Sequence, residues 1–400
     1  MSVNTQLCPV CGSGNLNSFF KVTGVPVNIG ILWPDREAAI QCLKGDIHLA
    51  FCIACGFITN LMFDPARVEY TQEYDNSLFF SPFYQNYSRS TAVRLIERYA
   101  LRNKSVIEIG SGKGDFLVLL CELGMNRAVG FDPSFNPASS KVGNIGSVTI
   151  IQDYYSEKYS HYKADLVCCR YVFEHLPDPV SFLGMVRRAI GEKKDTVLYF
   201  EVPNALYIIR NLSVWDIIYE HCSYFCRNSL SYVFTHCGFS VRSLEELFDA
   251  EYLQIEATPG GKEGRAVCLG GEETEEIAEE VAKFKKGFAE KMAAWRKCLN
   301  DLKKTGRRTV LWGAGAKGVS FLNMLQVQDE VACVVDINPQ KRSMYIPGTG
   351  HKILAPGDLR NDPPDVVLIM NHVYGEEIRS QIESLGFSTE ILLVDKISDR

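Results

Sequence analysis

The feature that most constrains the fold of this chain is a pair of glycine-rich loops, each placed between a buried strand and a helix. The first is "VIEIGSGKGDF" (106–116), and the second is "TVLWGAGAKG" (309–318). Around each loop, short apolar segments alternate with helical ones, a pattern typical of parallel sheets covered by helices. We therefore expect two α/β units in tandem.

Apolar segments mark the expected strands of both units. In the first unit, strands are expected within residues 104–110, 127–132, 148–153, 164–172, 196–204 and 238–248. In the second unit, they are expected at the start of 309–318 and within 331–336, 365–370 and 389–395. Each unit thus has the strand and helix alternation of a doubly wound sheet.

A single long helix is predicted between the two units, over residues 272–304. Its apolar residues are spaced by threes and fours, as on one face of a helix: Ile277, Val281, Phe284, Phe288, Met292, Trp295, Leu299 and Leu302. Such a stripe is expected to pack on a neighbouring domain. A dimer seam is the alternative.

Composition limits the partners and the location of the protein. The chain has 400 residues and a formal net charge of -6, with no basic run, so nucleic acid is not an expected partner. Its start, "MSVNTQLCPVCG", lacks a secretory signal pattern, and no apolar stretch is long enough to span a membrane. Fourteen cysteines without an export signal indicate reduced thiols. We expect a cytoplasmic monomer or homodimer that acts on a small molecule.

Two CxxC pairs, Cys8–Cys11 and Cys52–Cys55, lie in the first 65 residues. A glycine follows each pair and lets the chain turn back, so each pair can present two thiolates to one metal. Four thiolates complete the tetrahedral shell that zinc prefers in structural sites, and they leave no open position for chemistry. We expect structural zinc here. The alternatives are buried free thiols and a redox pair.

The first glycine-rich loop contains Gly110, Gly112 and Gly114. These glycines let the backbone approach a ligand, and the N–H groups of the following helix favour an anion or a polar group. The pattern alone is not specific, because dinucleotide-binding folds share it.

Acidic residues occur at three consecutive strand ends of the first unit. Glu108 lies in the strand before the loop, where a carboxylate can meet a ligand amine or brace the turn. Asp132 ends the next strand, at the place of a ribose-binding carboxylate, and Asp153 ends the third, where an adenine edge would lie. With these acids and "EHLPDP" (174–179) after the fourth strand, the unit resembles class I S-adenosylmethionine-dependent methyltransferases. Glu174 in that segment is expected to face solvent.

The second loop has a complete GxGxxG pattern in Gly313, Gly315 and Gly318, and Asp336 ends the next strand. By pattern alone it is a better dinucleotide fingerprint than the first loop. It therefore supports an alternative function, that of an NAD(P)-dependent oxidoreductase.

The order of parts along the chain is more specific than any single motif. The CxxC pairs are followed by "EYDNS" (73–77), the first unit with "EVPN" (201–204), then "YEHCSYF" (219–225), "GAGAKG" (313–318) and "YIPGTGHKI" (345–353). In this order the whole chain resembles the sugar C-methyltransferases of deoxysugar pathways, which belong to natural-product biosynthesis. Those enzymes use S-adenosylmethionine to methylate C3 of a nucleotide-linked 4-keto-sugar.

The resemblance implies an α/β chain with a small zinc-binding domain and two Rossmann-like domains. The expected boundaries are 1–65 for the zinc-binding domain, 66–270 for a class I methyltransferase domain, 271–305 for the connecting helix and 306–400 for a C-terminal Rossmann-like domain.

The resemblance also implies the catalytic residues. His221 is expected to be the base, with Glu220 beside it, and Tyr74 and His175 are expected in the same cleft. The chemistry is consistent with these residue types, because a ketone acidifies the neighbouring C–H, and a histidine can take that proton while donors hold the enolate oxygen. Structural roles are the alternatives for His221, His175 and Tyr74.

Two positions depart from the family. Tyr219 stands where the family has a first histidine, and Ile218 where it has a tyrosine. We expect these two differences to affect which keto compound is the substrate more than which type of reaction is catalysed. The alternative within the class is an O- or N-methyltransferase on another small biosynthetic intermediate.

Substrate contacts are implied at Tyr224, Gly315 and Lys317, with Lys317 near a phosphate of the substrate. For the second glycine loop, three interpretations stay open: contact with a phosphate-bearing substrate or domain packing, nicotinamide binding, and a vestigial site.

Overall fold

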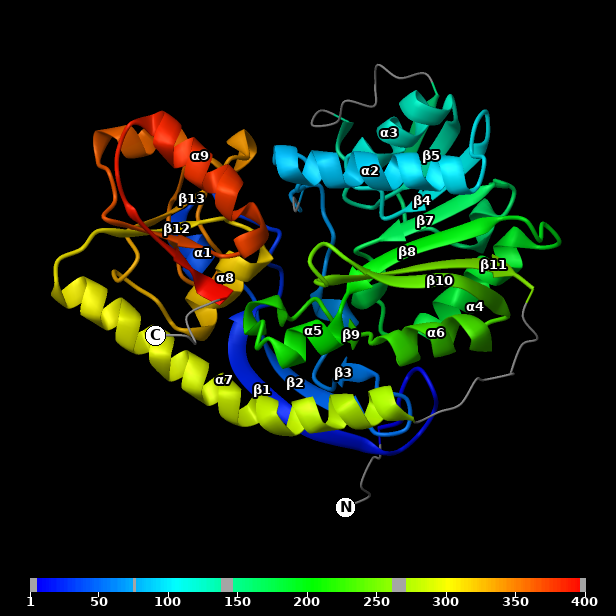
Figure 1. The fold of residues 1–400 in the computed structure, drawn as a ribbon, viewed down its shortest axis with the longest axis horizontal. Helices are drawn as coiled ribbons and strands as arrows, with labels where there is room; N and C mark the ends of the chain where they lie inside the picture. The colour runs from blue at the N-terminus through cyan, green and yellow to red at the C-terminus, as the bar shows by residue number, and fades with distance from the viewer. Residues whose placement is uncertain (1–5, 75–76, 138–146, 261–270, 396–400) are drawn as a thin grey trace.

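The computed structural model describes residues 6–74, 77–137, 147–260 and 271–395, and it contains three β-sheets (Figure 1). Two of them are the sheets of the expected α/β units, and the third is a four-stranded sheet near the N-terminus. Asp75 and Asn76 of "EYDNS" lie outside the described residues. Of the helices described, none is long and apolar enough to cross a bilayer.

The largest sheet has seven strands in the order β10-β11-β8-β7-β4-β5-β6. Its parallel strands are β4 (Ser105–Ile109), β5 (Arg127–Phe131), β6 (Val148–Ile151), β7 (Leu166–Arg170) and β8 (Val197–Pro203). An antiparallel strand, β11 (Tyr252–Pro259), lies between β8 and β10 (Phe239–Leu247). This is the Rossmann-like sheet expected for a class I methyltransferase domain.

Helices cover both faces of this sheet (Figure 1). The helices α2 (Pro82–Arg98) and α3 (Asp115–Gly124) lie on one face, and α4 (Pro179–Ile190) and α6 (Arg227–His236) lie on the other. A short helix, α5 (Ala205–Arg210), follows β8.

The strand β11 was not among the strands expected from the sequence. Its polar residues Gln254 and Glu256 interrupt the apolar pattern, yet both are fully buried. Both side chains bind the guanidinium of Arg94, on α2. In the sequence these two polar residues suggest a surface segment, because the arginine that pairs with them when they are buried lies on a distant helix.

The N-terminal sheet is antiparallel, with β1 (Leu16–Pro26), β2 (Lys44–Cys52) and β3 (Ile58–Asn60). Its fourth strand, β9 (Ser223–Tyr224), comes from the segment that follows His221. The connection between β1 and β2, with the short helix α1 (Arg36–Ile40), reaches the C-terminal domain, where Trp33 pairs with Tyr345.

The C-terminal sheet is parallel, in the order β14-β13-β12-β15-β16. Its strands are β12 (Thr309–Trp312), β13 (Cys333–Val335), β14 (Ile353–Leu354), β15 (Val366–Ile369) and β16 (Glu390–Leu393). The helices α8 (Ala316–Met324) and α9 (Gly375–Leu385) belong to the same domain. This order is that of a Rossmann-like unit, as the second glycine loop predicts.

The connecting helix α7 (Glu272–Lys304) runs beneath β1 towards α8 (Figure 1). Phe284 on its apolar stripe packs edge-on against Phe20 of β1, and Trp295 packs against Phe321 of α8. The stripe therefore packs on neighbouring domains within the chain, as the spacing predicts.

We expect the substitution Gly318→Ala to destabilise the C-terminal domain. A Cβ at Gly318 would lie 2.1 Å from the carbonyl oxygen of Gly313, so α8 would have to move away from the loop. Overpacking of this kind costs about 1–3 kcal/mol in the free energy of unfolding, which urea unfolding measures. Gly357→Ala is the matched control, because no atom lies within 4 Å of its Cβ. Equal stability of the two variants would contradict the prediction.

Candidate functional site

A cavity of about 1090 Å³ lies where the three parts of the chain meet. The carboxyl ends of β4, β5, β7 and β8 form one wall, which is the ligand-binding edge of an open α/β sheet. The N-terminal part contributes residues such as Trp33, and the C-terminal domain contributes Ala316 and Lys341.

The first glycine loop lies at this wall. Gly110 and Gly112 line the cavity and both have positive φ, and a Cβ at Gly110 would lie 2.1 Å from the side chain of Val172. Gly112 has open space at the Cβ position and donates its N–H to a carboxylate oxygen of Asp132 over 2.7 Å. Gly114 is the N-cap residue of α3 and does not line the cavity.

Two acidic side chains face a ligand at this end. Glu108 is buried, its Oε2 has no hydrogen-bond partner among the described residues, and burial raises its pKa to about 8. Asp132 also lines the cavity, where its other oxygen accepts hydrogen bonds from Ser134. An unpaired carboxyl group and a second carboxylate fit the amino group and the ribose hydroxyls of S-adenosylmethionine.

Asp153 lies outside the cavity wall. Its carboxylate forms an ion pair with Lys158 and accepts a hydrogen bond of 2.7 Å from the hydroxyl of Tyr159. The following residues, Tyr154 and Tyr155, line the cavity instead. These two tyrosines were not among the expected site residues, although their place directly after a strand end was a usable signal.

His221 and His175 meet in the same cavity, with ring centroids 4.9 Å apart. The Nδ1 atom of His221 is buried and has no hydrogen-bond partner among the described residues. Burial lowers the pKa of the imidazole well below its usual value, so the ring stays neutral at neutral pH. The imidazole of His175 beside it lowers the same pKa further.

His175 is held through Nδ1, which lies 2.9 Å from the hydroxyl of Tyr70 and 3.2 Å from the carbonyl oxygen of Glu220. Burial lowers the pKa of His175 to about 4, so this imidazole is neutral at neutral pH. Tyr70 was not among the expected site residues. It belongs to the aromatic segment before Tyr74, which was the available signal.

Glu220 does not face the imidazole of His221. Its carboxyl group accepts a hydrogen bond of 3.0 Å from the N–H of Ile29, and one of 3.4 Å from the hydroxyl of Tyr74. It is fully buried, and burial raises its pKa to about 8. Tyr74 lines the cavity, so Glu220 lies behind Tyr74.

The expectation that Glu174 faces solvent is wrong. Its side chain is 2% exposed and lines the cavity, and its Oε2 has no hydrogen-bond partner in the described part of the chain. One ligand atom each of Glu174, His175 and His221 lies within 4.8 Å of the others. Burial raises the pKa of Glu174 to about 8. The sequence hid this because Glu174 begins a segment that reads as a polar loop.

Tyr224 is buried behind His221, and its ring centroid lies 6.0 Å from that of the imidazole. Its hydroxyl donates to the carbonyl oxygen of Ile218, and the residue does not line the cavity.

In the second glycine loop, Gly315 is the N-cap residue of α8, and Ala316 is the loop residue that lines the cavity. Lys317 is directed to the methyltransferase domain, where it forms ion pairs with Glu251 at 3.1 Å and Asp216 at 3.2 Å. The lysines that line the cavity are Lys113 and Lys341.

The four cysteines of the CxxC pairs converge at the end of β2. The Sγ atoms of Cys8 and Cys55 are 3.7 Å apart, those of Cys11 and Cys52 are 3.6 Å apart, and all four lie within 4.8 Å of one another. Zinc–sulfur bonds of about 2.3 Å in a tetrahedron separate the sulfur atoms by about 3.8 Å. The cluster therefore fits one structural zinc ion, and its four thiolates would leave no coordination position open for a substrate.

Two protein-family models match this chain. Residues 84–244 match the methyltransferase domain family, and residues 266–390 match the C-methyltransferase C-terminal domain family. The C-methyltransferase NovU of Streptomyces niveus is 27% identical over 299 residues, which cover 71% of this chain and 70% of that protein.

Solved structures similar to the chain cover its methyltransferase region. Magnesium protoporphyrin IX methyltransferase from Synechocystis, with bound SAH, is 15% identical, covers 44% of this chain and 84% of its own, and has a TM-score of 0.35. A SAM-dependent methyltransferase from Aquifex aeolicus is 14% identical, covers 45% of this chain and 94% of its own, and also has a TM-score of 0.35.

We expect purified protein to carry one equivalent of zinc, and Cys52→Ser to lose it together with much of its stability, because zinc affinity at such sites is folding free energy. Metal analysis by mass spectrometry measures the content. Cys42→Ser is the control, since Cys42 is buried but lies outside the cluster. Well-folded protein free of zinc would contradict the assignment.

Proposed function

We propose that this chain, an S-adenosylmethionine-dependent methyltransferase with a C-methyltransferase C-terminal domain, methylates a carbon of a nucleotide-linked 4-keto-deoxysugar, at C3. The observation that carries this proposal is the imidazole of His221, which lines the cavity and whose buried Nδ1 has no hydrogen-bond partner among the described residues. Transfer to carbon needs a base of this kind, because a C–H group must first lose its proton.

The reaction begins with proton removal. The 4-ketone acidifies the C3–H bond, His221 Nδ1 accepts the proton, and the electron pair of that bond enters the enolate. When bound, S-adenosylmethionine would supply the methyl group to C3, and its sulfonium sulfur would keep the electron pair of the broken S–C bond and leave as S-adenosylhomocysteine. The lowered pKa of His221 keeps the imidazole neutral, and therefore able to act as a base, from neutral pH into the acidic range.

The negative charge on the enolate oxygen would be stabilised by an uncharged hydrogen-bond donor in the cavity. Glu174 retains its proton at neutral pH because its pKa is raised to about 8, so its carboxyl group can donate a hydrogen bond. Tyr74 lines the same wall, but its hydroxyl donates its single proton to Glu220 over 3.4 Å, so the donor is assigned to Glu174. Donors placed where charge develops lower the barrier without reorganisation.

The phosphates of the substrate are assigned to the opposite end of the cavity, at the C-terminal domain. Lys341 of the C-terminal domain lines this end, and Lys113, from the first glycine loop, reaches it by donating to Gln340 over 2.8 Å. Lys341 donates to the carbonyl oxygen of Ala314 over 3.0 Å, so its ammonium group is held at the second glycine loop. Lys341 itself lies 3.5 Å from a carboxylate oxygen of Asp336. Two cations nevertheless suit a diphosphate better than Lys317, which is paired with two carboxylates.

Residues for the methyl donor are proposed at the first loop, namely Glu108, Gly110, Gly112 and Asp132. We expect Asp132→Ala to weaken binding of S-adenosylhomocysteine about 10- to 100-fold, because hydrogen bonds to a charged group contribute about 1.5–3 kcal/mol. Calorimetry measures the Kd. Asp336→Ala, the same change at the second loop, is the control and should bind normally. NADH binding that survives Asp132→Ala but disappears with Asp336→Ala would favour an oxidoreductase.

The substrate class is tested with a panel of nucleotide-linked 4-keto-deoxysugars, incubated with the protein and S-adenosylmethionine. We expect His221→Asn to reduce methylation about 10²–10⁴-fold, the usual effect of removing a general base. Exchange of the C3 proton in heavy water should fall in parallel, whereas binding of donor and sugar should persist. Mass spectrometry and NMR measure both reactions.

Two results would contradict the proposal. A product with its methyl group on oxygen or nitrogen would support the alternative class of acceptor. A His221→Asn variant with nearly full exchange and a lowered melting temperature would make His221 a structural residue.

A further inference from the structure

Glu174, His175 and His221 come from two segments of the chain that are hydrogen-bonded to each other. Glu174 and His175 belong to the short turn after β7 (Phe173–His175), and His221 lies just before β9. The N–H of Cys222 donates to the carbonyl oxygen of Glu174 over 3.1 Å. The backbone of the fold therefore fixes where the three side chains start.

The metal-ligating atoms of these side chains lie close together. One such atom of each residue lies within 4.8 Å of the other two, and all three residues line the cavity. The two imidazole planes meet at 75°. Zinc bonds of about 2.0–2.1 Å to nitrogen and oxygen place neighbouring ligand atoms about 3.3–3.4 Å apart in a tetrahedron. Small side-chain rotations would thus bring the three atoms onto one ion.

Two of the side chains also carry unsatisfied polar atoms. Oε2 of Glu174 and Nδ1 of His221 are buried and have no hydrogen-bond partner among the described residues, and Glu174 as a whole is only 2% exposed. A buried polar atom without a partner is costly unless a ligand satisfies it. Deep burial is what the cysteine cluster shows as well, where Cys8 is 2% and Cys52 0% exposed.

His175 has the outer contact that is usual for a metal ligand. Its Nδ1 lies 3.2 Å from the carbonyl oxygen of Glu220 and 2.9 Å from the hydroxyl oxygen of Tyr70. A carbonyl oxygen can only accept, so a proton on Nδ1 satisfies this contact and leaves a lone pair on Nε2. Metal-binding histidines commonly donate their other ring N–H to a carbonyl or carboxylate oxygen in this way.

The residue types select the class of ion. Two imidazole nitrogens and one carboxylate oxygen suit zinc and similar divalent transition metals, whereas magnesium and calcium prefer oxygen ligands throughout. Three protein ligands also leave a coordination position open, unlike four thiolates. We therefore expect weaker binding here than at the cysteine cluster, so that purified protein retains zinc only at the cysteines.

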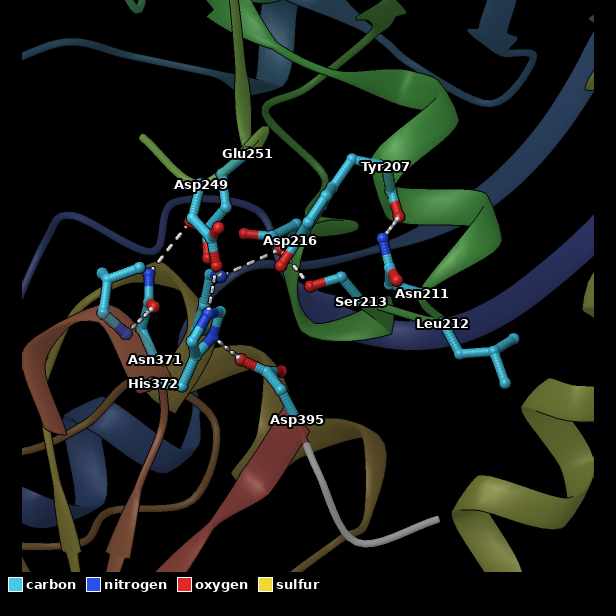
Figure 2. A network of polar contacts seen from close by, with 12 residues as sticks. Tyr207, Asn211, Leu212, Ser213, Asp216, Asp249, Glu251, Asn371, His372 and Asp395 are labelled. Atoms are coloured by element: carbon cyan, nitrogen blue, oxygen red, sulfur yellow. Dashed lines mark hydrogen bonds and ion pairs between the residues drawn. The ribbon is translucent and has the colours of Figure 1, made fainter. Parts of the chain in front are cut away.

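A second group of metal-ligating residues, Glu251, His372 and Asp395, lies between the methyltransferase domain and the C-terminal domain (Figure 2). Here the protein supplies its own cation, because Nζ of Lys317 lies 3.1 Å from a carboxylate oxygen of Glu251. His372 is in addition bound through Nε2 to Asp249 over 2.7 Å. This group is the matched control, since it has similar residue types but an internal lysine.

We propose that Glu174, His175 and His221 form a second metal site, which binds one zinc or similar divalent transition-metal ion and thereby inhibits methyl transfer. This inference rests on the function proposed for His221. A bound ion would take the lone pair that accepts the C3 proton, and it would occupy the carboxyl group that donates to the enolate oxygen. Metal ion and keto-sugar therefore exclude each other.

The first experiment is a calorimetric titration with Zn²⁺ of full-length protein that already carries one zinc equivalent at its cysteines. We expect one further equivalent in the unmodified protein and in His372→Gln. Glu174→Gln keeps the size of the side chain but replaces the carboxylate by a poor ligand. Its affinity should fall about 100-fold or more, since loss of an outer contact alone costs about 10- to 100-fold. If this variant does not fold, His175→Gln removes another ligand and should give the same result.

The second experiment measures methylation of a nucleotide-linked 4-keto-deoxysugar at increasing Zn²⁺ concentrations. We expect the apparent KM for the sugar to rise with zinc while kcat stays constant, both in the unmodified protein and in His372→Gln. The residual activity of Glu174→Gln should not respond to the same concentrations. Binding of S-adenosylhomocysteine should be unaffected by zinc.

Three results would overturn the inference: no further zinc equivalent in the unmodified protein, a further equivalent that persists in Glu174→Gln and His175→Gln, or its loss in His372→Gln. Failure of the proposed function is distinguishable, because it would appear as full C3 proton exchange in His221→Asn. The zinc stoichiometry needs no substrate and would still report on the metal site.

Discussion

The pairing of β9 with β3 is the interaction on which the site depends. It places Ser223 opposite Thr59 and Tyr224 opposite Ile58, so the chain directly after His221 becomes the edge strand of the N-terminal sheet. The N–H of Cys222 donates to the carbonyl oxygen of Glu174 over 3.1 Å, which joins the same segment to the methyltransferase sheet. Together with α8, three parts of the chain thus fix one short segment. The predicted domain boundaries remain proposals, because this segment belongs to more than one of them.

The cysteine cluster acts on the site through this sheet. Cys52 ends β2 and Cys55 lies in the turn that leads to β3, and Cys226 donates to the carbonyl oxygen of Gly56 in that turn over 3.4 Å. A metal ion that closes the turn would fix β3, and with it the edge on which β9 pairs. A structural zinc site can therefore matter for activity without any contact with the substrate.

Sequence patterns predicted the parts of this molecule that local interactions determine. Both glycine loops, the parallel strands and the long helix follow from periodicity and turn chemistry, and the convergence of His175 and His221 followed from resemblance. The failures share a cause, which is a partner distant in the sequence. Lys317 was expected to bind phosphate, but Asp216 and Glu251 neutralise it across a domain interface. Glu174 was expected at the surface, but it is 2% exposed and lines the cavity beside His221. Tyr70 was overlooked because its partner, His175, lies 105 residues later in the chain.

Burial in this cavity reverses the order of its acids and bases. In water a carboxyl group loses its proton before an imidazolium does, but here the pKa of Glu174 is raised to about 8 and that of His175 is lowered to about 4. Between these values, the carboxyl group is an acid and the imidazoles are bases. When two titratable groups of one site have pKa values shifted in opposite directions, one usually serves as the general acid and the other as the general base of the reaction. Formation of an enolate needs both, a base for the carbon and a donor for the oxygen, and the same exclusion of water that creates these roles strengthens the hydrogen bonds that stabilise the charge.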